Sequence, residues 1–301
     1  MSEPSAADNF AFFLSGVGHR VVRTESAHWY DASRLCFLSL PSHHLLDPHP
    51  HELREVLRRG RCLGARFPAE IEGPGKASYQ IVCDDRDYRV DHLSANVRSK
   101  VRRGLRRCEV RSVPFEELAA HGVAADRDTL ARQGRRVRLK REQWQRYWET
   151  AAATPGMEGW AAFAGGQLAA FLVTVRFESC VEFLLARSRS DLLDSYPNNA
   201  LIFVVTEEML VRRRLREVTF GLESLEPVGP LDQFKLSMGF RQRPIRQRVF
   251  FHPLLRAIMR VGPLRLGVYR WAQHHGAEGA FWKKAAGLLR LAEEGGLGPS
   301  L

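Results

Sequence analysis

Three apolar runs joined by short links form the clearest pattern in the chain. The runs are Trp160–Ala164, Gln167–Val175 and Cys180–Ala186. The first link, Gly165-Gly166, accommodates the positive φ values of a tight hairpin turn. Links this short join antiparallel strands, because parallel strands need a long crossover. The pattern therefore predicts an antiparallel meander of three strands.

A helix and another strand follow the meander. Pro197 suits the first turn of a helix, and apolar positions continue along one face of the segment after it. The run Arg216–Leu222 is typical of a strand that returns to the sheet. Because a strand–helix–strand unit of this kind is a right-handed crossover, its two strands are predicted to be parallel. A short helix that ends before Gly239 and a last strand over residues 241–251 complete the set.

The segments before the meander carry strand and helix patterns as well. A strand is predicted over residues 108–114, and helices over 115–122 and 141–153. The order from residue 108 onward is therefore β-α-α-β-β-β-α-β-α-β. The first 107 residues carry a smaller set of similar elements. Strands are predicted near 19–24, 31–40, 61–69 and 78–84, a helix at 51–60 and a basic helix at 93–107.

Composition narrows the class of protein. An apolar content of 45% is ordinary for a globular chain. No run approaches the roughly 18 uncharged apolar residues of a membrane-spanning helix. The first twenty residues lack the basic region of a secretory signal, so we expect a cytoplasmic protein. The five cysteines have no CxxC pairing, which favours reduced thiols in the core.

The net charge of +11 predicts a polyanionic partner, which is a nucleic acid, an anionic membrane surface or a phosphate-rich cofactor. Residues 253–301 read as short basic amphipathic helices, which either cover a core or make peripheral contact with a membrane. A histidine cluster lies at His43, His44, His49 and His51. It lacks the spacing of a metal site, and Pro48 and Pro50 favour a polar loop, so no metal is expected there.

The order of elements is similar to the GNAT acyltransferase fold, and three stretches resemble its Fem-type branch. They are LSANVRSKVRRGLRRCEVRSV, SYPNNALIFVVTEEMLVRRRLREVTFG and LDQFKLSMGF, which begin at residues 93, 195 and 231. The resemblance covers residues 80–250 well. It implies a mixed, mostly antiparallel sheet flanked by helices. The implied domains are a degenerate GNAT-like N-terminal half over 1–107, a GNAT acyltransferase domain over 108–252 and a basic helical tail over 253–301.

Two positions depart from the ordinary GNAT pattern. The glycine-rich Q/R-x-x-G-x-G/A loop, which holds the pyrophosphate of coenzyme A, is replaced here by ARSRSDLLDSYPNN, which contains no glycine. Fem-type relatives also lack this loop. The strand before Gly221 often carries an acidic residue in relatives, where this chain has Thr219.

The resemblance implies transfer of an acyl group from acyl-CoA, or a similar thioester, to a small-molecule or peptide amine. Such a reaction needs a neutral amine, a polarised carbonyl and a proton for the leaving group. In this fold the meander and the parallel strand separate, and the donor carbonyl inserts between them. One alternative is a Fem-type transferase that uses aminoacyl-tRNA. Another, of a different class, is a non-catalytic module that binds nucleic acid or a membrane surface.

Three residues are candidates for proton transfer. Glu182 lies in an otherwise apolar strand, where it is either a base in a cleft or the partner of an arginine. Glu223 follows the strand that ends at Leu222, where sites in such sheets lie, and is a candidate base or ribose ligand. Tyr196 precedes the crossover helix and can protonate a leaving group, or it packs as a loop residue.

The remaining candidates bind anions. Asn198 and Asn199 begin the crossover helix, whose free N–H groups favour a phosphate, although both also suit a simple helix start. Lys235 matches the lysine of the family's closing segment and is a candidate ligand of phosphate or carboxylate, with Asp232 as its neighbour. A basic stripe that faces either solvent or an anionic substrate is formed by Arg98, Arg102 and Arg106.

Overall fold

The computed structural model describes residues 3–33, 35–134, 139–224 and 229–260. The chain divides into two compact units. The first unit comprises Met1–Val17, Ile81–Gly221 and Gly229–Gln242, and the second comprises Gly18–Gln80, Leu222–Val228 and Arg243–Leu301. The domain boundaries expected after residues 107 and 252 stay a prediction.

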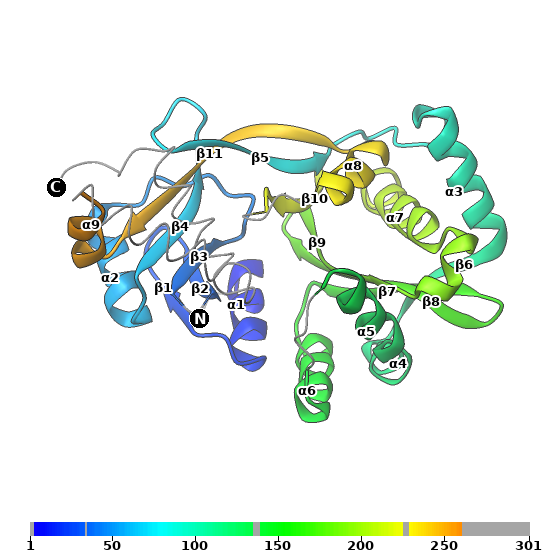
Figure 1. The fold of residues 1–301 in the computed structure, drawn as a ribbon, viewed down its shortest axis with the longest axis horizontal. Helices are drawn as coiled ribbons and strands as arrows, with labels where there is room; N and C mark the ends of the chain where they lie inside the picture. The colour runs from blue at the N-terminus through cyan, green and yellow to red at the C-terminus, as the bar shows by residue number, and fades with distance from the viewer. Residues whose placement is uncertain (1–2, 34, 135–138, 225–228, 261–301) are drawn as a thin grey trace. The chain divides into compact units, whose positions relative to one another are not determined.

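The first unit contains the predicted meander and the parallel crossover (Figure 1). Its strands lie in the order β10-β9-β8-β7-β6. Neighbours are antiparallel except β9 and β10, which are parallel as predicted. Gly165 and Gly166 have positive φ values of 56° and 77°, which the hairpin turn requires. The bounds are β6 Cys108–Val113, β7 Met157–Ala164, β8 Gln167–Phe177, β9 Cys180–Ser188 and β10 Glu217–Leu222.

Helices cover both faces of this sheet. α3 and α7 lie on one face, and α4, α5 and α6 lie on the other (Figure 1). The crossover helix α7 ends at Glu207, and a π-helical turn over Glu208–Arg212 follows it. No helix in the described ranges is both long and apolar enough to cross a bilayer. The helix bounds are α1 Ala6–Gly16, α3 Ala95–Arg107, α4 Phe115–His121, α5 Val123–Arg132, α6 Arg141–Ala152, α7 Pro197–Glu207 and α8 Gly229–Ser237.

Two helices of the first unit, α1 and α5, were not predicted from the pattern. Helix α1 begins at a capping box in which the Ser5 side chain accepts from the backbone of Asp8 and the Asp8 carboxylate accepts from Ser5. It buries Phe10 and Phe13, and the Phe10 ring meets Phe177 of β8 edge to face at 5.5 Å. The apolar stretch near the start of the chain is therefore part of the folded core.

The second unit has its strands in the order β1-β2-β3-β4-β11-β5. The single strand predicted over residues 31–40 is wrong, since two strands, β2 and β3, form an antiparallel pair there. Strands β3 and β4 are parallel, and β4 and β11 are antiparallel. Strands β5 and β11 contribute residues to both units. The bounds are β1 Val21–Arg23, β2 His28–Ser33, β3 Cys36–Leu40, β4 Gly64–Ala69, β5 Lys76–Cys83, β11 Arg241–Phe251, α2 Pro50–Gly60 and α9 Pro253–Arg260.

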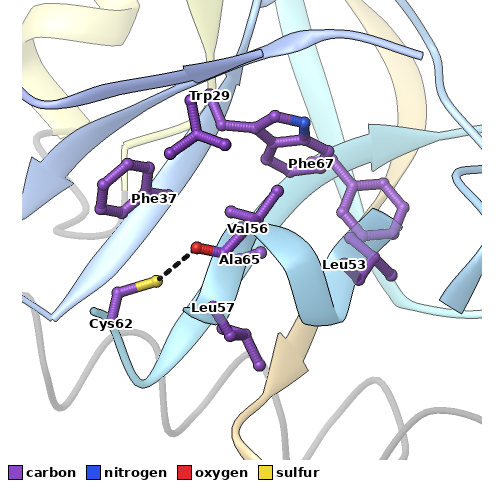
Figure 2. Packing of buried hydrophobic residues seen from close by; sticks show 9 residues of the cluster. Trp29, Phe37, Leu53, Val56, Leu57, Cys62, Ala65 and Phe67 are labelled. Atoms are coloured by element: carbon purple, nitrogen blue, oxygen red, sulfur yellow. Dashed lines mark hydrogen bonds between the residues drawn. The ribbon is translucent and has the colours of Figure 1, made fainter. Parts of the chain in front are cut away.

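The core of the second unit forms where α2 packs on the sheet (Figure 2). Val56 of α2 meets a group of aromatic side chains from three strands, Trp29, Phe37 and Phe67, and all four are 1% exposed or less. The Trp29 indole N–H donates a hydrogen bond to the Thr24 hydroxyl at 2.9 Å. This cluster therefore buries a large apolar area and leaves no indole donor without a partner. Burial of apolar area is the main contribution to the stability of a small unit.

We expect Phe67→Ala to destabilise the protein by about 3–5 kcal/mol, because the substitution leaves a cavity beside Trp29. Urea denaturation followed by circular dichroism measures the change. Leu254→Ala is the matched control, since Leu254 is 72% exposed, and it should change stability by about 0.5 kcal/mol or less. Equal losses of unfolding free energy in the two variants would contradict the position of this core.

Candidate functional site

The parallel strands β9 and β10 separate after a short paired segment. They are paired at Glu217–Cys180, Val218–Val181 and Thr219–Glu182. Beyond these, no further pair joins the described residues of the two strands, while β9 stays paired with β8 as far as Ser188. The pairing of β9 with β8 also shifts by one residue between Phe183 and Leu185. The backbones therefore diverge at Glu182.

Glu182 is the carboxylate at the last paired position. It is half-buried and lies opposite Val175 on β8 and Thr219 on β10. Thr219 is fully buried, donates its hydroxyl to the carbonyl of Ile81 at 3.0 Å and accepts from the Gly221 N–H at 2.9 Å. Thr219 thus has a structural role where relatives often carry an acid, and Glu182 supplies the carboxylate of this pair.

The segment between β9 and α7 occupies the position of the pyrophosphate loop. A 3-10 helix covers Ser190–Ser195, and Tyr196 adopts a left-handed conformation with φ 56° and ψ 43° just before the helix begins. Four backbone N–H groups of this segment already have protein acceptors. They belong to Ser188, Arg189, Ser190 and Tyr196.

Carboxylates hold this segment. Asp128 accepts from both the N–H and the hydroxyl of Ser190, and the Arg189 guanidinium contacts Asp191 at 2.5 Å. The backbone N–H of Ser190 lowers the pKa of Asp128, and the hydrogen bond from Arg189 lowers the pKa of Asp191. Both carboxylates are therefore charged at neutral pH, and each pairs with an arginine, Asp128 with Arg132 at 3.3 Å and Asp191 with Arg189 at 2.5 Å.

Helix α5 anchors the end of β9. Asp126 pairs with Arg187 at 2.6 Å, and Thr129 exchanges hydrogen bonds with the backbone of Ser188 at 2.9 and 3.0 Å. Arg132 donates to the Ser188 carbonyl at 3.0 Å. Sequence analysis missed these residues, although Asp126, Thr129 and Arg132 recur every third position in a segment without proline, which is a pattern typical of one helical face.

The two asparagines at the start of α7 contact protein groups. The Asn198 amide donates to the Ser188 hydroxyl at 3.1 Å, and the Asn199 amide lies 3.5 Å from the Met238 sulfur. Lys235 pairs with Asp232 at 2.8 Å and lies 5.3 Å from the centre of the Phe220 ring. Asn199 thus contacts Met238, the residue after α8, and Lys235 links α8 to β10.

The predicted arginine stripe does not reach the loop before α7. Arg98 and Arg102 turn toward Asp91, with Arg102 at 2.9 Å from its carboxylate, and Arg106 is exposed. Other arginines of α3 make the contact instead. The Arg103 guanidinium stacks 4.7 Å over the Tyr196 ring, and Arg107 donates to the Asp194 carbonyl at 2.7 Å.

Glu223 lies in the second unit within a buried polar network. Its carboxylate accepts from the Ser78 hydroxyl at 2.7 Å, and Ser78 accepts from the Gln247 amide at 2.6 Å. Arg66 donates to the Gln247 side chain and, at 3.1 Å, to the Glu223 carbonyl. Arg66 is 8% exposed, and burial lowers its pKa to about 10. Sequence analysis missed these three partners, because they are isolated polar residues on three different strands.

A surface pocket of about 470 Å³ in the first unit is lined in part by Arg189, the residue that follows β9. Its polar lining consists mainly of compensated charges, such as Arg111 paired with Glu117 at 2.6 Å. None of the candidate residues lines it. The pocket therefore adds no group to the candidate chemistry.

The histidine cluster and the cysteines make contacts within the fold. His49 caps α2, and its ring accepts from the His51 N–H at 3.2 Å. In the part of the chain that the structure describes, no group of three or more histidine, cysteine or acidic residues is arranged to hold a metal. All five cysteines are unpaired and buried, as predicted, and burial raises the pKa of Cys36 to about 12.

Comparison with known proteins gives structural similarity without sequence matches. No protein-family model and no curated protein sequence matches the chain. FemX superposes with a TM-score of 0.53 at 10% identity, covering 79% of this chain and 90% of FemX. The C-terminal domain of a protein from Agrobacterium fabrum, assigned as a lysylphosphatidylglycerol synthetase, gives 0.54 at 12% identity, covering 82% and 87%. L-PGS from Bacillus licheniformis gives 0.53 at 14% identity, covering 87% and 92%.

These similarities, with the meander, the parallel crossover and the separating strands, define the fold. The chain has a GNAT-like fold of the Fem type, as the element order predicted. The sheet is mixed and mostly antiparallel, with helices on its faces.

The packing of α3 on α7 generates a test of the candidate site. A Cβ added at Gly104 would lie 2.7 Å from the Tyr196 carbonyl oxygen and 3.0 Å from the Ala200 Cβ. We expect Gly104→Ala to destabilise the protein by about 1–2 kcal/mol, because this crowding outweighs the roughly 1 kcal/mol by which alanine favours a helix. Thermal denaturation measures it. Ser99→Ala, on the exposed part of the same helix, is the control and should leave the stability unchanged. A Gly104→Ala protein as stable as wild type would refute the close contact between α3 and α7.

Proposed function

We propose that this chain transfers an aminoacyl group from an aminoacyl-tRNA to an amine. The observation that carries this proposal is the segment between β9 and α7. Its N–H groups at Ser188, Arg189 and Ser190 already have protein acceptors, and it contains no glycine. These features disfavour a coenzyme A pyrophosphate there, whereas a tRNA ester has no pyrophosphate to bind.

Two further features support an aminoacyl donor. The net charge of +11 suits a polyanionic partner, and the basic stripe Arg98, Arg102 and Arg106 is our candidate for RNA phosphates. Two of the similar structures carry the name of lysylphosphatidylglycerol synthetase, in full or abbreviated as L-PGS. The acyl-CoA donor that the sequence favoured stays a prediction with less support from this loop.

The chemistry can be assigned to candidate groups. The acceptor nitrogen attacks the ester carbonyl, a C–N bond forms, and the C–O bond to the ribose breaks. Within the first unit, Glu182 takes the proton from the attacking nitrogen, and Tyr196 supplies the proton that the leaving ribose oxygen needs. Glu223, in the second unit, stays the other candidate base. Asn198, Asn199 and Lys235 are candidates for binding donor phosphates or carboxylates at the start of α7.

Donor preference is tested by binding. We expect bulk aminoacylated tRNA at about 100 times its dissociation constant to stabilise the protein by roughly 2.7 kcal/mol at low salt. The effect should fall steeply as salt rises, because phosphate contacts release counterions. Acetyl-CoA and longer acyl-CoA esters should give no shift in the same thermal melt.

The outcomes of this experiment separate the three functions. A salt-tolerant shift with one acyl-CoA ester would replace our proposal by the thioester reaction. A shift with tRNA that is identical for charged and uncharged forms, without any transfer of a labelled amino acid to an amine, would favour the non-catalytic nucleic-acid module. The double variant Arg102→Gln/Arg106→Gln should weaken tRNA binding and reduce its salt dependence.

The proton-transfer roles are tested by amide substitutions. We expect Glu182→Gln or Glu223→Gln to reduce kcat by about 10²–10⁴-fold, because the amide cannot accept the proton of the amine. The melting temperature should change little. Single-turnover transfer of a labelled amino acid measures the rate, with Glu109→Gln as a control on the strand β6. Unchanged turnover in both site variants would remove both glutamates from the mechanism.

A peripheral membrane contact is a further part of the proposal. Helix α9 begins the basic C-terminal tail, and its Leu254 is 72% exposed. An exposed leucine beside cationic residues suits the surface of an anionic bilayer. We propose that the acceptor amine is met in the cytoplasm, at or near such a surface.

A further inference from the structure

Strand β6 forms one edge of the sheet in the first unit (Figure 1). On one side it pairs with β7 over six successive residue pairs, from Cys108–Ala164 to Val113–Gly159. On the other side, no strand of the described ranges pairs with it. Residues 109–113 also make no backbone hydrogen bond to any other described segment. The outward N–H and C=O groups of β6 are therefore a template for another strand.

Strand β6 carries few of the features that protect an edge strand from pairing. Such strands are commonly very short, bent by a bulge, or interrupted by proline or lysine. β6 has six residues, contains neither proline nor lysine, and keeps a continuous register with β7. Its only charged residues are Glu109 and Arg111, which have opposite signs. They lie on one face of the strand, because they are two positions apart.

Glu109 has no close cation among the described residues of its own chain. Its carboxylate lies 3.6 Å from the Arg111 Nε atom, which is beyond hydrogen-bond distance, and its side chain is 73% exposed. The two terminal nitrogens of Arg111 bind Glu117 instead, at 2.6 and 3.1 Å. Glu109 and Arg111 both line the surface pocket, so this face is hollow beside the strand. A second cation can therefore approach Glu109 there.

A second copy of the chain supplies that cation when its β6 is paired about Val110. A twofold axis perpendicular to the sheet makes the two strands antiparallel, and directly opposite side chains then lie on the same face. With Val110 opposite Val110 of the second copy, Glu109 faces Arg111 of that copy, and Arg111 faces its Glu109. Registers centred on Glu109 or on Arg111 would instead place like charges directly opposite each other, which is unfavourable. The two charges therefore favour the register about Val110.

The other face of β6 fits the same register. Val110 is half-buried and would meet its own equivalent at the axis, which adds an apolar contact at the centre. Ser112 is exposed and would face Cys108 of the second copy. Residues 108–112 of each copy are then paired. Since this is a short stretch of strand, the interface is small, and weak, reversible association is typical of interfaces below about 1,200 Å².

We propose that β6 is a self-association edge, through which two copies of this chain pair antiparallel about Val110 and join their first-unit sheets. Two reciprocal pairs of Glu109 with Arg111 set the register. The dimer is weak and reversible. This inference is independent of the proposed transfer reaction, because none of the candidate groups for that reaction lies on β6.

Charge reversal tests the register. Glu109→Arg places an arginine opposite Arg111 of the second copy, and Arg111→Glu places a glutamate opposite Glu109. In sedimentation equilibrium we expect the wild-type chain to dimerise with rising concentration, and each variant to raise the dissociation constant of the dimer by about tenfold or more. In an equimolar mixture of the two variants, opposite charges face each other at both positions. The mixture should therefore form a heterodimer with nearly the wild-type affinity.

Cysteine cross-linking gives a second test that does not depend on charge. In Val110→Cys the two new thiols lie directly opposite each other, at a Cα separation of about 4.5–5.5 Å that a disulfide can bridge. We expect oxidation to yield a disulfide dimer, with the bond mapped to position 110 by mass spectrometry of peptides. Ser99→Cys is the control, because it places an exposed thiol on α3 away from the edge, and it should not cross-link. This test decides the question if Arg111→Glu, which also loses its contact with Glu117, fails to fold.

Three results would overturn the inference. The first is a wild-type chain that stays monomeric at about 1 mM. The second is a dimer that both charge reversals leave unchanged, since its interface would then lie elsewhere. The third is a Val110→Cys protein that cross-links no better than Ser99→Cys.

Discussion

The short parallel pairing between β9 and β10 is the constraint on which the first unit depends. Only three residue pairs join the strands, and the last of them couples Glu182 to Thr219. After that position β9 continues with β8, so its backbone hydrogen bonds remain satisfied while it leaves β10. A sheet can open at this point without leaving the whole of β9 unpaired, and a half-buried carboxylate lies at the opening.

The segment that follows β9 is held by side chains instead of glycines. Carboxylate and hydroxyl groups of α5 bind the backbone of Ser188 and Ser190, and arginines of α3 contact Asp194 and Tyr196 from the other side. A loop of this kind is preorganised, and four of its N–H groups, at Ser188, Arg189, Ser190 and Tyr196, are bound to protein acceptors. Those four groups are not open to a phosphate oxygen.

The second unit combines an apolar core with a directional polar network. Its aromatic cluster under α2 supplies the burial that a small unit needs. The polar chain from Arg66 to Glu223 crosses β4, β11 and β5, so it exists only when these strands are assembled in this order.

The sequence by itself determined the meander and the parallel crossover, because glycine links, strand periodicity and the start at Pro197 are local signals that tertiary contacts did not override. The Fem-type fold was implied by the resemblance of three stretches to that family. It also identified Glu182 and Glu223 as unusual carboxylates. It missed α5, and it predicted one strand over residues 31–40 where β2 and β3 form a pair. It did not single out Arg103 and Arg107 of α3, which contact Tyr196 and Asp194. The partners of Glu223 lie up to 157 positions away from it, at Arg66, and such contacts leave no periodic trace. Only the tertiary structure decided them, since strand order brings together residues that no local pattern connects.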